Sequence, residues 1–273
     1  MDDPPYLVVG GTSFLARAFA ACAFRPACRF VGHDAVADPA VFDGVAGIVN
    51  FALDPRWRRE DCPPEQCLDL RLGRIAADRG LRFVMMSSRK VYDPARQWDA
   101  HEAAPTRPVD AYGRNKLAAE RGLRELLGDR LLVLRAANVF GFERQPGRRT
   151  FMAMALESLA TRGEIVLDVD PGVERDFVPV DDAVALLSAA LRRGIAGTYN
   201  LGSGTATPVG MIAQWVIDGF GHGVLRVTDN RAFDRFRLDS SRLRQALGAP
   251  AAVALERRCR DIGRRLAEHN PAI

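Results

Sequence analysis

Long apolar runs are absent from the sequence, and none reaches the roughly 18–20 residues that a membrane-spanning helix needs. The first residues, 1–5, carry two aspartates and lead straight into a short apolar run, which is unlike a secretory signal peptide. These absences argue against membrane and secreted classes of protein. We therefore expect a cytoplasmic protein with no membrane partner.

Residues that bind metal ions are sparse. The five cysteines include no C-x-x-C pair, and together with the four histidines they form no spacing typical of a metal site. We therefore expect reduced thiols, as is usual in the cytoplasm, and no bound metal.

A strong excess of one charge is also missing. The 273 residues include 38 basic and 34 acidic side chains, for a net charge of +4, and 48% of the chain is hydrophobic. This composition is ordinary for a globular protein. Basic clusters at 144–149 and 257–265 are more typical of solvated faces than of a nucleic-acid surface, and a local anion such as a diphosphate suits them as well. We expect no nucleic-acid partner.

Lysine is nearly absent, because only Lys90 and Lys116 are lysines and every other basic residue is arginine. A retained lysine suggests a need for a compact ammonium instead of a planar guanidinium. Lys116 follows Tyr112 by four residues in a segment of helical character, so both side chains lie on one helix face. An ammonium there favours the phenolate and makes the tyrosine a workable proton donor and acceptor. The alternative is a chance pair on a solvated face.

Near its start the chain contains a pattern typical of nucleotide binding. The apolar run at 6–9 predicts a buried strand, and a helix follows the turn through residues 17–21. Strand, glycine turn and helix direct backbone N–H groups at a phosphate, although a plain tight turn is the alternative. The spacing matches G-x-x-G-x-x-G, with Ser13 and Ala16 at the second and third glycine positions. The predicted cofactor residues of this turn are Gly10, Ser13, Phe14, Leu15 and Ala16.

The next predicted strand, 28–31, ends near Asp34, which lies 24 residues beyond Gly10. This is close to the interval of ~20 residues expected for an acid that binds a ribose hydroxyl. The carboxylate would repel a 2′-phosphate and so favours NAD over NADP; the alternative is a loop aspartate without a ligand. A further buried strand, 48–52, ends at Ala52, which we include among the cofactor-binding residues.

A later predicted strand, 81–86, follows an irregular segment at 54–67 and a helix at about 68–79, and it runs into Ser87 and Ser88. Hydroxyls at the carboxyl end of a parallel strand lie where open α/β sheets bind ligands. A serine hydroxyl at Ser88 can hydrogen-bond a substrate oxygen and share its proton with Tyr112. Taken alone, the position favours the alternative, a helix-capping serine.

Together these segments resemble the extended short-chain dehydrogenase/reductases, the NAD-dependent epimerase/dehydratase family, which mostly acts on nucleotide sugars. The resemblance covers nearly the whole chain. The matching motifs are 9–16, 87–92, 112–120, 134–141, 174–182, 198–204 and 238–242. The resemblance implies a Rossmann-type doubly wound parallel sheet with a small C-terminal substrate-binding subdomain.

The resemblance also implies domain limits and roles. Residues 1–140 would bind the dinucleotide and carry the catalytic helix, and residues 141–273 would form mainly the substrate lobe, with about 174–200 returning to the first domain. Ser88, Tyr112 and Lys116 would be catalytic, and Lys116 would also bind the nicotinamide ribose. Substrate contacts would come from Ser88, Asn138, Arg175 and Arg231. The helix near Tyr112 would form a homodimer face.

The chain departs from the family's pattern at several positions. No asparagine occurs between Asn50 and Asn115, so the structural asparagine usual in the mid-sheet helix is missing. Dehydratases of the family carry an Asp-Glu pair after the catalytic hydroxyl, where this chain has Arg89 and Lys90. This argues against 4,6-dehydration, because loss of water needs an acid and a base.

Three functions remain open at this point. The leading hypothesis is a nucleotide-sugar 4-keto reductase using NAD or NADP, in which Tyr112 donates a proton to the substrate. The second is a nucleotide-sugar 4-epimerase that uses the same residues with tightly bound NAD, which Asp34 favours. The third is a dinucleotide-binding regulator without turnover, which the altered glycine turn suggests and the set Ser88, Tyr112 and Lys116 argues against.

Overall fold

The central sheet is built from short, continuous apolar runs because helices cover both of its faces. The computed structural model describes residues 4–144, 149–249 and 254–270. Six parallel strands lie in the order β10-β6-β4-β3-β1-β2. The strands are β1 (Tyr6–Val9), β2 (Cys28–Val31), β3 (Gly47–Asn50), β4 (Arg82–Ser88), β6 (Leu131–Ala136) and β10 (Gly197–Leu201). The predicted strands at 6–9, 28–31, 48–52 and 81–86 are confirmed, with bounds that differ by up to two residues.

The order of the strands reverses beside β1. Strand β2 lies outside β1, whereas β3 lies on its other side and the later strands continue from there. At such a switch point the connections leave toward opposite faces and open a crevice at the carboxyl ends of the strands. The crevice therefore lies beyond Val9 of β1 and Asn50 of β3. The predicted doubly wound, Rossmann-type sheet is confirmed.

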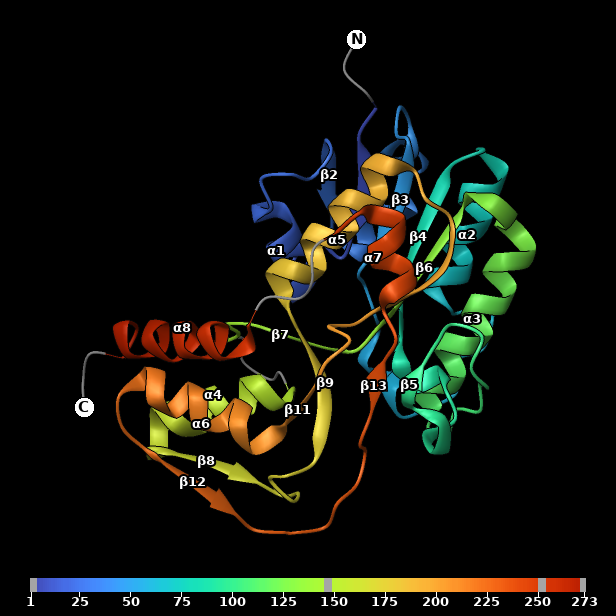
Figure 1. Ribbon diagram of the computed structural model, residues 1–273. Coiled ribbons are helices and arrows are strands. Elements are labelled where there is room, and N and C mark those ends of the chain that lie inside the picture. Colours follow the sequence, from blue (N-terminus) through green and yellow to red (C-terminus); the bar gives the residue numbers. More distant parts are fainter. Residues whose placement is uncertain (1–3, 145–148, 250–253, 271–273) are drawn as a thin grey trace.

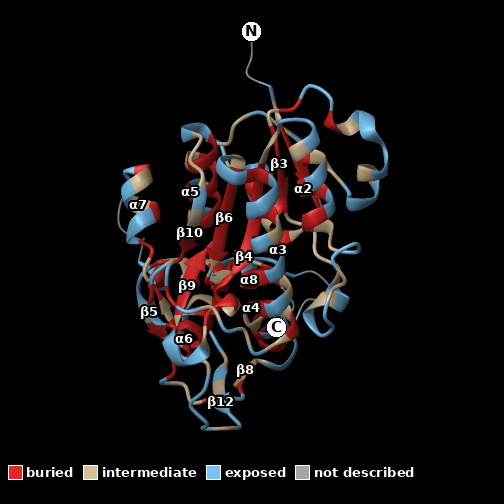
Figure 2. Cartoon of the chain, turned by 90° about the vertical axis from the view of Figure 1, so that its right-hand side faces the viewer, coloured by how far each residue is buried: buried red, intermediate tan, exposed pale blue. Residues whose placement is uncertain are grey.

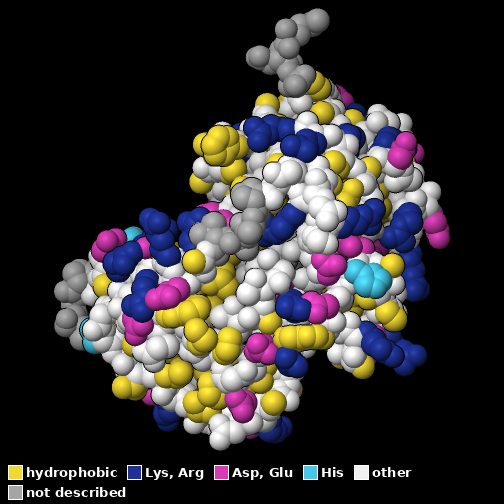
Figure 3. All heavy atoms as spheres, in the orientation of Figure 1, with side chains coloured by type: hydrophobic (Ala, Val, Ile, Leu, Met, Phe, Trp, Pro, Cys, Tyr) yellow, Lys and Arg dark blue, Asp and Glu magenta, His cyan; other side chains and the backbone are white. Residues whose placement is uncertain are grey.

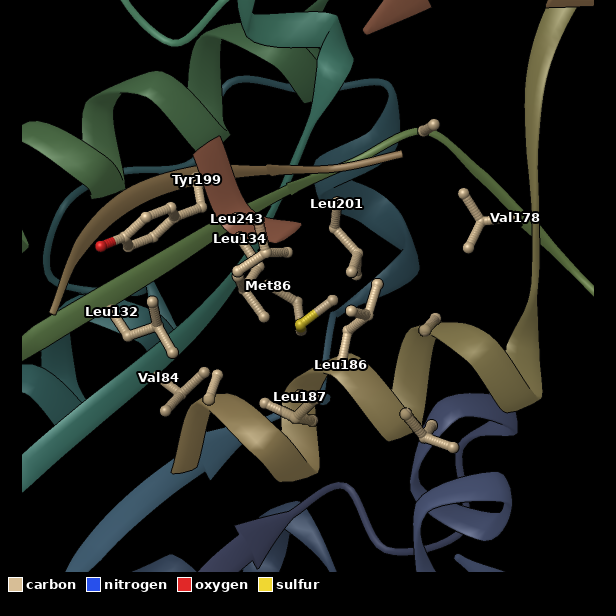
Figure 4. Packing of buried hydrophobic residues seen from close by; sticks show 14 of the residues in the cluster. Val84, Met86, Leu132, Leu134, Val178, Leu186, Leu187, Tyr199, Leu201 and Leu243 are labelled. Carbon is tan, nitrogen blue, oxygen red and sulfur yellow. The ribbon is translucent and has the colours of Figure 1, made fainter. Parts of the chain in front are cut away.

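Two pairs of helices cover the sheet (Figure 1). On one face α1 (Phe14–Ala21) packs beside α5 (Val180–Arg193), and on the other α2 (Leu68–Asp78) packs beside α3 (Ala111–Leu127). Figure 4 shows Leu186 and Leu187 of α5 directed at strand side chains such as Met86. Burying one such side chain stabilises the fold by about 1.5–3 kcal/mol. The strands and inward helix faces are accordingly buried, while outer helix faces are exposed (Figure 2).

A smaller lobe below the sheet has a core of its own (Figure 1). It contains α4 (Phe151–Arg162), α6 (Val209–Phe220), α8 (Leu255–Glu268) and the parallel pair β8 (Glu164–Leu167) and β12 (Val224–Val227). Helices α6 and α8 are amphipathic, and their apolar faces pack on each other and on α4.

Strand β9 (Glu174–Pro179) joins the two lobes. It lies between β7 (Asn138–Phe140) and β11 (Ala206–Pro208) in a three-stranded sheet. Phe177 packs in the core of the small lobe and the next residue, Val178, packs in that of the large lobe. The chain then enters α5 and β10 in the large lobe. Two later elements also belong to the large lobe. Strand β13 (Arg237–Leu238) pairs with β5 (Trp98–Ala100), and α7 (Ser241–Leu247) packs in the same core.

Candidate functional site

A cavity of about 930 Å³ lies at the switch point of the sheet. Its walls come from the segments after β2 and β3, from the start of α2 and from the first turns of α3. Four predicted site residues line it together: Asp34, Ala52, Tyr112 and Lys116. A volume of this size accommodates a ligand at the upper end of the usual range for small-molecule sites.

Helix α3 holds Tyr112 and Lys116 in place through its first turn. The Asp110 carboxylate caps the helix by accepting from the Gly113 N–H at 2.7 Å. Gly113 has no space for a side chain, because a Cβ there would lie 2.3 Å from the Lys90 carbonyl oxygen. The helix start therefore packs directly on the backbone that follows Ser88. This contact brings the tyrosine helix and the serine strand to one end of the sheet.

Lys116 is buried and forms an ion pair inside the cavity wall. Its Nζ donates to Asp69 Oδ2 at 3.0 Å, and both side chains are less than a tenth exposed. Burial lowers the pKa of Lys116, but the electrostatic influence of Asp69 and then Tyr112 outweighs burial, so the pKa is raised above the ordinary value. The ammonium therefore stays charged beside the tyrosine.

Tyr112 is half-buried, and a second cation lies near its ring. The Arg58 guanidinium is 5.4 Å from the centre of the Tyr112 ring. Arg58 belongs to the predicted irregular segment 54–67, in which the structure has one short 3-10 helix at Pro55–Arg58. Asn115 fastens this segment to α3, since its side chain accepts from the Cys62 N–H and donates to the carbonyls of Trp57 and Glu60.

Ser88 ends strand β4 and is 9% exposed. Its hydroxyl accepts from the Lys90 N–H at 3.2 Å and so caps the short 3-10 helix Arg89–Val91. This is the capping geometry that we considered as the alternative role. Ser88 is not among the residues lining the large cavity, so its link to Tyr112 is the packing of α3 on the Lys90 backbone.

The glycine turn is a tight, left-handed turn at Gly10, whose φ is +82°. A Cβ at Gly10 would lie 2.6 Å from the Ala52 nitrogen, so the turn packs closely on the chain leaving β3. The N–H groups of Gly10 and Gly11 both donate to Val31 O, and Ser13 Oγ accepts from the Ala16 N–H. Phe14 and Leu15 open α1, where the first N–H groups have no partner within the helix and can face an anion.

Asp34 lies just after β2 and its side chain is 94% exposed at the cavity. His33 Nε2 lies 3.2 Å from Asp34 Oδ1. The carboxylate is therefore accessible to a ligand at this end of the cavity, with an imidazole beside it.

The predicted substrate residues Asn138, Arg175 and Arg231 do not line this cavity and lie on β7, on β9 and in the segment after β12. Asn138 begins β7 and is half-buried. Arg175 of β9 donates to the carbonyl oxygens of Asp234 and Phe233, at 3.2 and 3.3 Å. Burial lowers the pKa of Arg175, the charge of Asp234 opposes that effect, and the net pKa is lowered. The Arg231 side chain is 80% exposed and pairs with Asp229, whereas that of Arg175 is bonded to the backbone at 233–234.

Asp234 is a residue that the sequence analysis missed. Its carboxylate accepts two hydrogen bonds from Arg89, at 2.7 and 2.5 Å, and lies 3.6 Å from Lys90 Nζ. An acid from elsewhere in the chain therefore pairs with Arg89 and Lys90, the two residues that stand where the resemblance leads us to expect an acid pair in a dehydratase. Asp69 was missed as well. No local pattern marked either one, because each acquires its partner only through packing.

The basic clusters have acidic neighbours. Of the cluster at 144–149, positions 145–148 lie outside the described residues. In α8, Arg258 pairs with Asp181 and Asp182, and Arg260 pairs with Asp218. On the face shown in Figure 3, basic and acidic side chains are interspersed.

No group of three or more potential metal ligands occurs in the part of the chain that the structure describes.

The sheet with its switch point, and the tyrosine and lysine on α3, define a Rossmann-type α/β protein of the extended short-chain dehydrogenase/reductase class. The family model for the NAD dependent epimerase/dehydratase family matches residues 40–202. The chain belongs to this family. Within the residues described, no helix is both long and apolar enough to cross a bilayer.

Two curated relatives and one solved structure illustrate the similarity. An ADP-L-glycero-D-manno-heptose-6-epimerase of Alkalilimnicola ehrlichii is 34% identical over 54% of this chain and 49% of its own. A dTDP-4-keto-6-deoxy-D-glucose reductase of Streptomyces niveus is 36% identical over 26% of this chain and 24% of its own. The matches therefore span about half or less of the relatives' lengths.

The solved structure shows the fold over the whole chain. A UDP-N-acetylglucosamine 4-epimerase from Methanobrevibacter ruminantium M1, in complex with UDP-N-acetylmuramic acid, has a TM-score of 0.81 and 16% identity. The superposition covers 98% of this chain and 100% of that one. At this identity the likeness shows the fold alone.

Proposed function

We propose that the protein is an NAD(P)-dependent oxidoreductase acting on a nucleotide sugar, with reduction of a 4-keto sugar as its leading reaction. The observation that carries the proposal is the shared cavity. It combines Tyr112 and Lys116 of one helix face with Asp34 and Ala52 at the carboxyl ends of the strands. The family assignment and the curated relatives, one an epimerase and one a reductase, support the same class of substrate.

A nicotinamide dinucleotide fits the residues present. The turn at Gly10 packs on Ala52, which lines the cavity, and the first N–H groups of α1 suit a diphosphate. None of the predicted turn residues Gly10, Ser13, Phe14, Leu15 and Ala16 lines the cavity itself. The exposed Asp34 carboxylate suits ribose hydroxyls and favours NAD over NADP. Lys116 donates one of its three N–H groups to Asp69, so two N–H groups remain for ligand hydroxyls. When bound, the cofactor supplies or accepts the hydride.

The residues of the chain would bind, orient and transfer the proton. In the reducing direction Tyr112 donates its proton to the keto oxygen, and in the oxidising direction it accepts one. Lys116 stabilises the phenolate left after donation. Ser88 holds the substrate oxygen next to Tyr112. Asn138, Arg175 and Arg231 would contact the sugar and the diphosphate through charge-assisted hydrogen bonds.

Reduction is preferred over dehydration because Arg89 and Lys90 replace an acid pair. Asp234 does not restore that pair, since it is held by Arg89 in two hydrogen bonds. The second candidate is 4-epimerisation with tightly held NAD, which the exposed Asp34 favours because the carboxylate selects against a 2′-phosphate.

The cofactor state of the purified protein tests these functions. Absorbance and analysis of released ligand that reveal tightly held NAD would support the epimerase. A protein that is purified without dinucleotide and oxidises NADH or NADPH only with a 4-keto sugar nucleotide would support the reductase. Binding of neither dinucleotide would reject both and favour a protein without turnover.

We further propose a cytoplasmic homodimer in which α3 contributes to the interface, and a substrate lobe formed mainly by residues 141–273. Helix α3 packs beside α2 on the outer side of the sheet, where its Leu126 is 37% exposed. Light scattering tests the assembly, and a monomer at micromolar concentration would contradict it.

A further inference from the structure

The buried Asp69 carboxylate of α2 links the end of strand β3 to helix α3. Only 6% of Asp69 is exposed. Its Oδ1 accepts from Asn50 Nδ2 at 2.7 Å, and its Oδ2 accepts from Lys116 Nζ at 3.0 Å. Each carboxylate oxygen thus has one short, buried partner. Asn50 and Lys116 are 19 and 47 residues away in the chain, so only the fold brings the three together.

The contacts continue to the glycine turn. The Asn50 side chain also accepts from the Ala52 N–H at 3.0 Å, and Ala52 packs on Gly10. A continuous line of contacts therefore runs from the glycine turn through Ala52, Asn50 and Asp69 to Lys116. A shift of Asp69 would disturb both ends of the cavity.

Lys116 needs a counter-charge because it is buried. An ammonium taken out of water without an acid partner tends to lose its proton. The titratable groups that face Lys116 are Asp69 and Cys67 at the start of α2, and Tyr112 on its own helix. Among the described residues, no carboxylate other than that of Asp69 lies in ion-pair contact with Lys116.

We propose that Asp69 is a positioning residue that keeps Lys116 charged and directs its two remaining donors into the cavity. The part of this inference that concerns the ligand rests on the proposed function. The ion pair is neutral as a whole, so Lys116 acts on Tyr112 as part of a dipole and not as a free charge. Helix α2 thereby supplies an acid in a chain that lacks the asparagine expected from the family resemblance.

The scarcity of lysine makes a direct test possible. With ¹³C-labelled lysine the protein gives side-chain NMR signals from Lys90 and Lys116 alone, and Lys90→Arg assigns them. We expect Lys116 of the unaltered protein to remain protonated throughout the neutral range. In Asp69→Asn its titration midpoint should move to lower pH, whereas Asp78→Asn, an exposed position on the same helix, should leave it unchanged.

Two results would overturn the proposal. One is a Lys116 midpoint that is the same in Asp69→Asn as in the unaltered protein. The other is loss of the Lys116 proton at neutral pH in the unaltered protein, a measurement that does not depend on whether the variant folds.

Dinucleotide affinity gives a second readout. Titration with NADH, followed by fluorescence, should show about tenfold weaker binding to Asp69→Asn at pH 9, with a smaller loss at pH 6.5, where an unpaired Lys116 regains its proton. Asp78→Asn should bind normally. If the unaltered protein binds NADH and Asp69→Asn matches it at every pH, Asp69 has no such role. If the unaltered protein binds neither NADH nor NADPH, the proposed function fails, and the lysine titration still decides the role of Asp69.

Discussion

At the scale of single residues, the site depends on where charges are buried. Lys116 remains a usable cation in a buried position because Asp69 offsets the cost of removing it from water. Tyr112 stays half-exposed at the cavity, next to Lys116 and under the Arg58 guanidinium. Tyr112 is thus reachable by a ligand, while the two cations beside it are held by the protein.

Removal of the Tyr112 hydroxyl should separate chemistry from binding. We expect Tyr112→Phe to lower kcat by roughly 10²–10⁴-fold, the usual contribution of a positioned acid or base. NADH affinity should stay within about twofold, because the ring and Lys116 remain. Steady-state kinetics and fluorescence titration measure the two effects. Tyr199→Phe, in strand β10, is the matched control. Retained turnover in Tyr112→Phe would show that another group transfers the proton.

Removal of Arg175 should weaken substrate binding more than cofactor binding. A charge-assisted hydrogen bond contributes about 1.5–3 kcal/mol, so Arg175→Ala should raise KM for the sugar nucleotide by roughly 10–100-fold. Arg231→Ala should have a smaller effect, since that side chain is exposed and already paired with Asp229. Arg226→Ala, on strand β12, serves as control. An unchanged KM in Arg175→Ala would contradict a contact with the diphosphate.

At the scale of elements, α3 is held to the sheet by a second buried ion pair, two turns beyond Tyr112. Glu120 is fully buried and accepts from Arg135 of β6 at 2.6 Å and from Ser87 of β4 at 2.5 Å. The Arg135 guanidinium also lies 4.8 Å from the centre of the Tyr92 ring. One helix is thus fixed to two neighbouring strands, which limits how far its tyrosine can move.

The loss of Glu120 should destabilise the protein strongly. Glu120→Ala leaves Arg135 buried without its acid, and breaking such a pair costs about 3–5 kcal/mol in the free energy of unfolding. Urea denaturation followed by circular dichroism measures the change, and the exposed Glu125→Ala on the same helix should stay within about 0.5 kcal/mol of the unaltered protein. In the double variant Glu120→Ala, Arg135→Ala the loss should be smaller than the sum of the single losses. Additive losses would mean that the two side chains do not stabilise each other.

At the scale of the whole molecule, the segment between β12 and β13 connects the two lobes (Figure 1). This segment contains Asp234, which accepts hydrogen bonds from Arg89. The Arg89 side chain is buried, with its guanidinium 3.7 Å from the centre of the Phe236 ring. Burial raises the pKa of Asp234, but the hydrogen bonds and charge of Arg89 outweigh it, so the net pKa is lowered. The contact therefore fastens the connection between lobes most firmly when Asp234 is ionised.

This contact should make stability depend on pH in the acid range. A carboxyl group whose pKa is lowered on folding contributes stability above its unfolded pKa of about 3.9 and loses that contribution as the pH falls through its folded value. Asp234→Asn should therefore lower Tm by about 2–4 °C at pH 7, the shift that ~1 kcal/mol produces in a chain of this size. The difference from the unaltered protein should hold down to about pH 5 and shrink below pH 4. Thermal melts from pH 7 to pH 3 check this, with exposed Asp78→Asn as control. A difference that does not vary with pH would exclude ionisation of Asp234 as its cause.

Short-range patterns in the sequence were sufficient to predict the strands of the sheet and the placement of the tyrosine and lysine on one helix face. Continuous apolar runs such as 6–9 and 81–86 specify buried strands whatever lies around them, and a spacing of four residues puts Tyr112 and Lys116 on one helix face. The turn at Gly10 is likewise local, because its left-handed backbone belongs to a single residue.

The partners of the buried charges were decided only by the tertiary structure. Asp69 and Lys116 are 47 residues apart in sequence, and Arg89 and Asp234 are 145 apart, so no local spacing could pair them. The local sequence around an aspartate does not show whether its side chain lies in solvent or beside a buried lysine. Its role depends on which helix packs on which strand, and that is settled by burial of the apolar faces of α2 and α3 over the whole sheet.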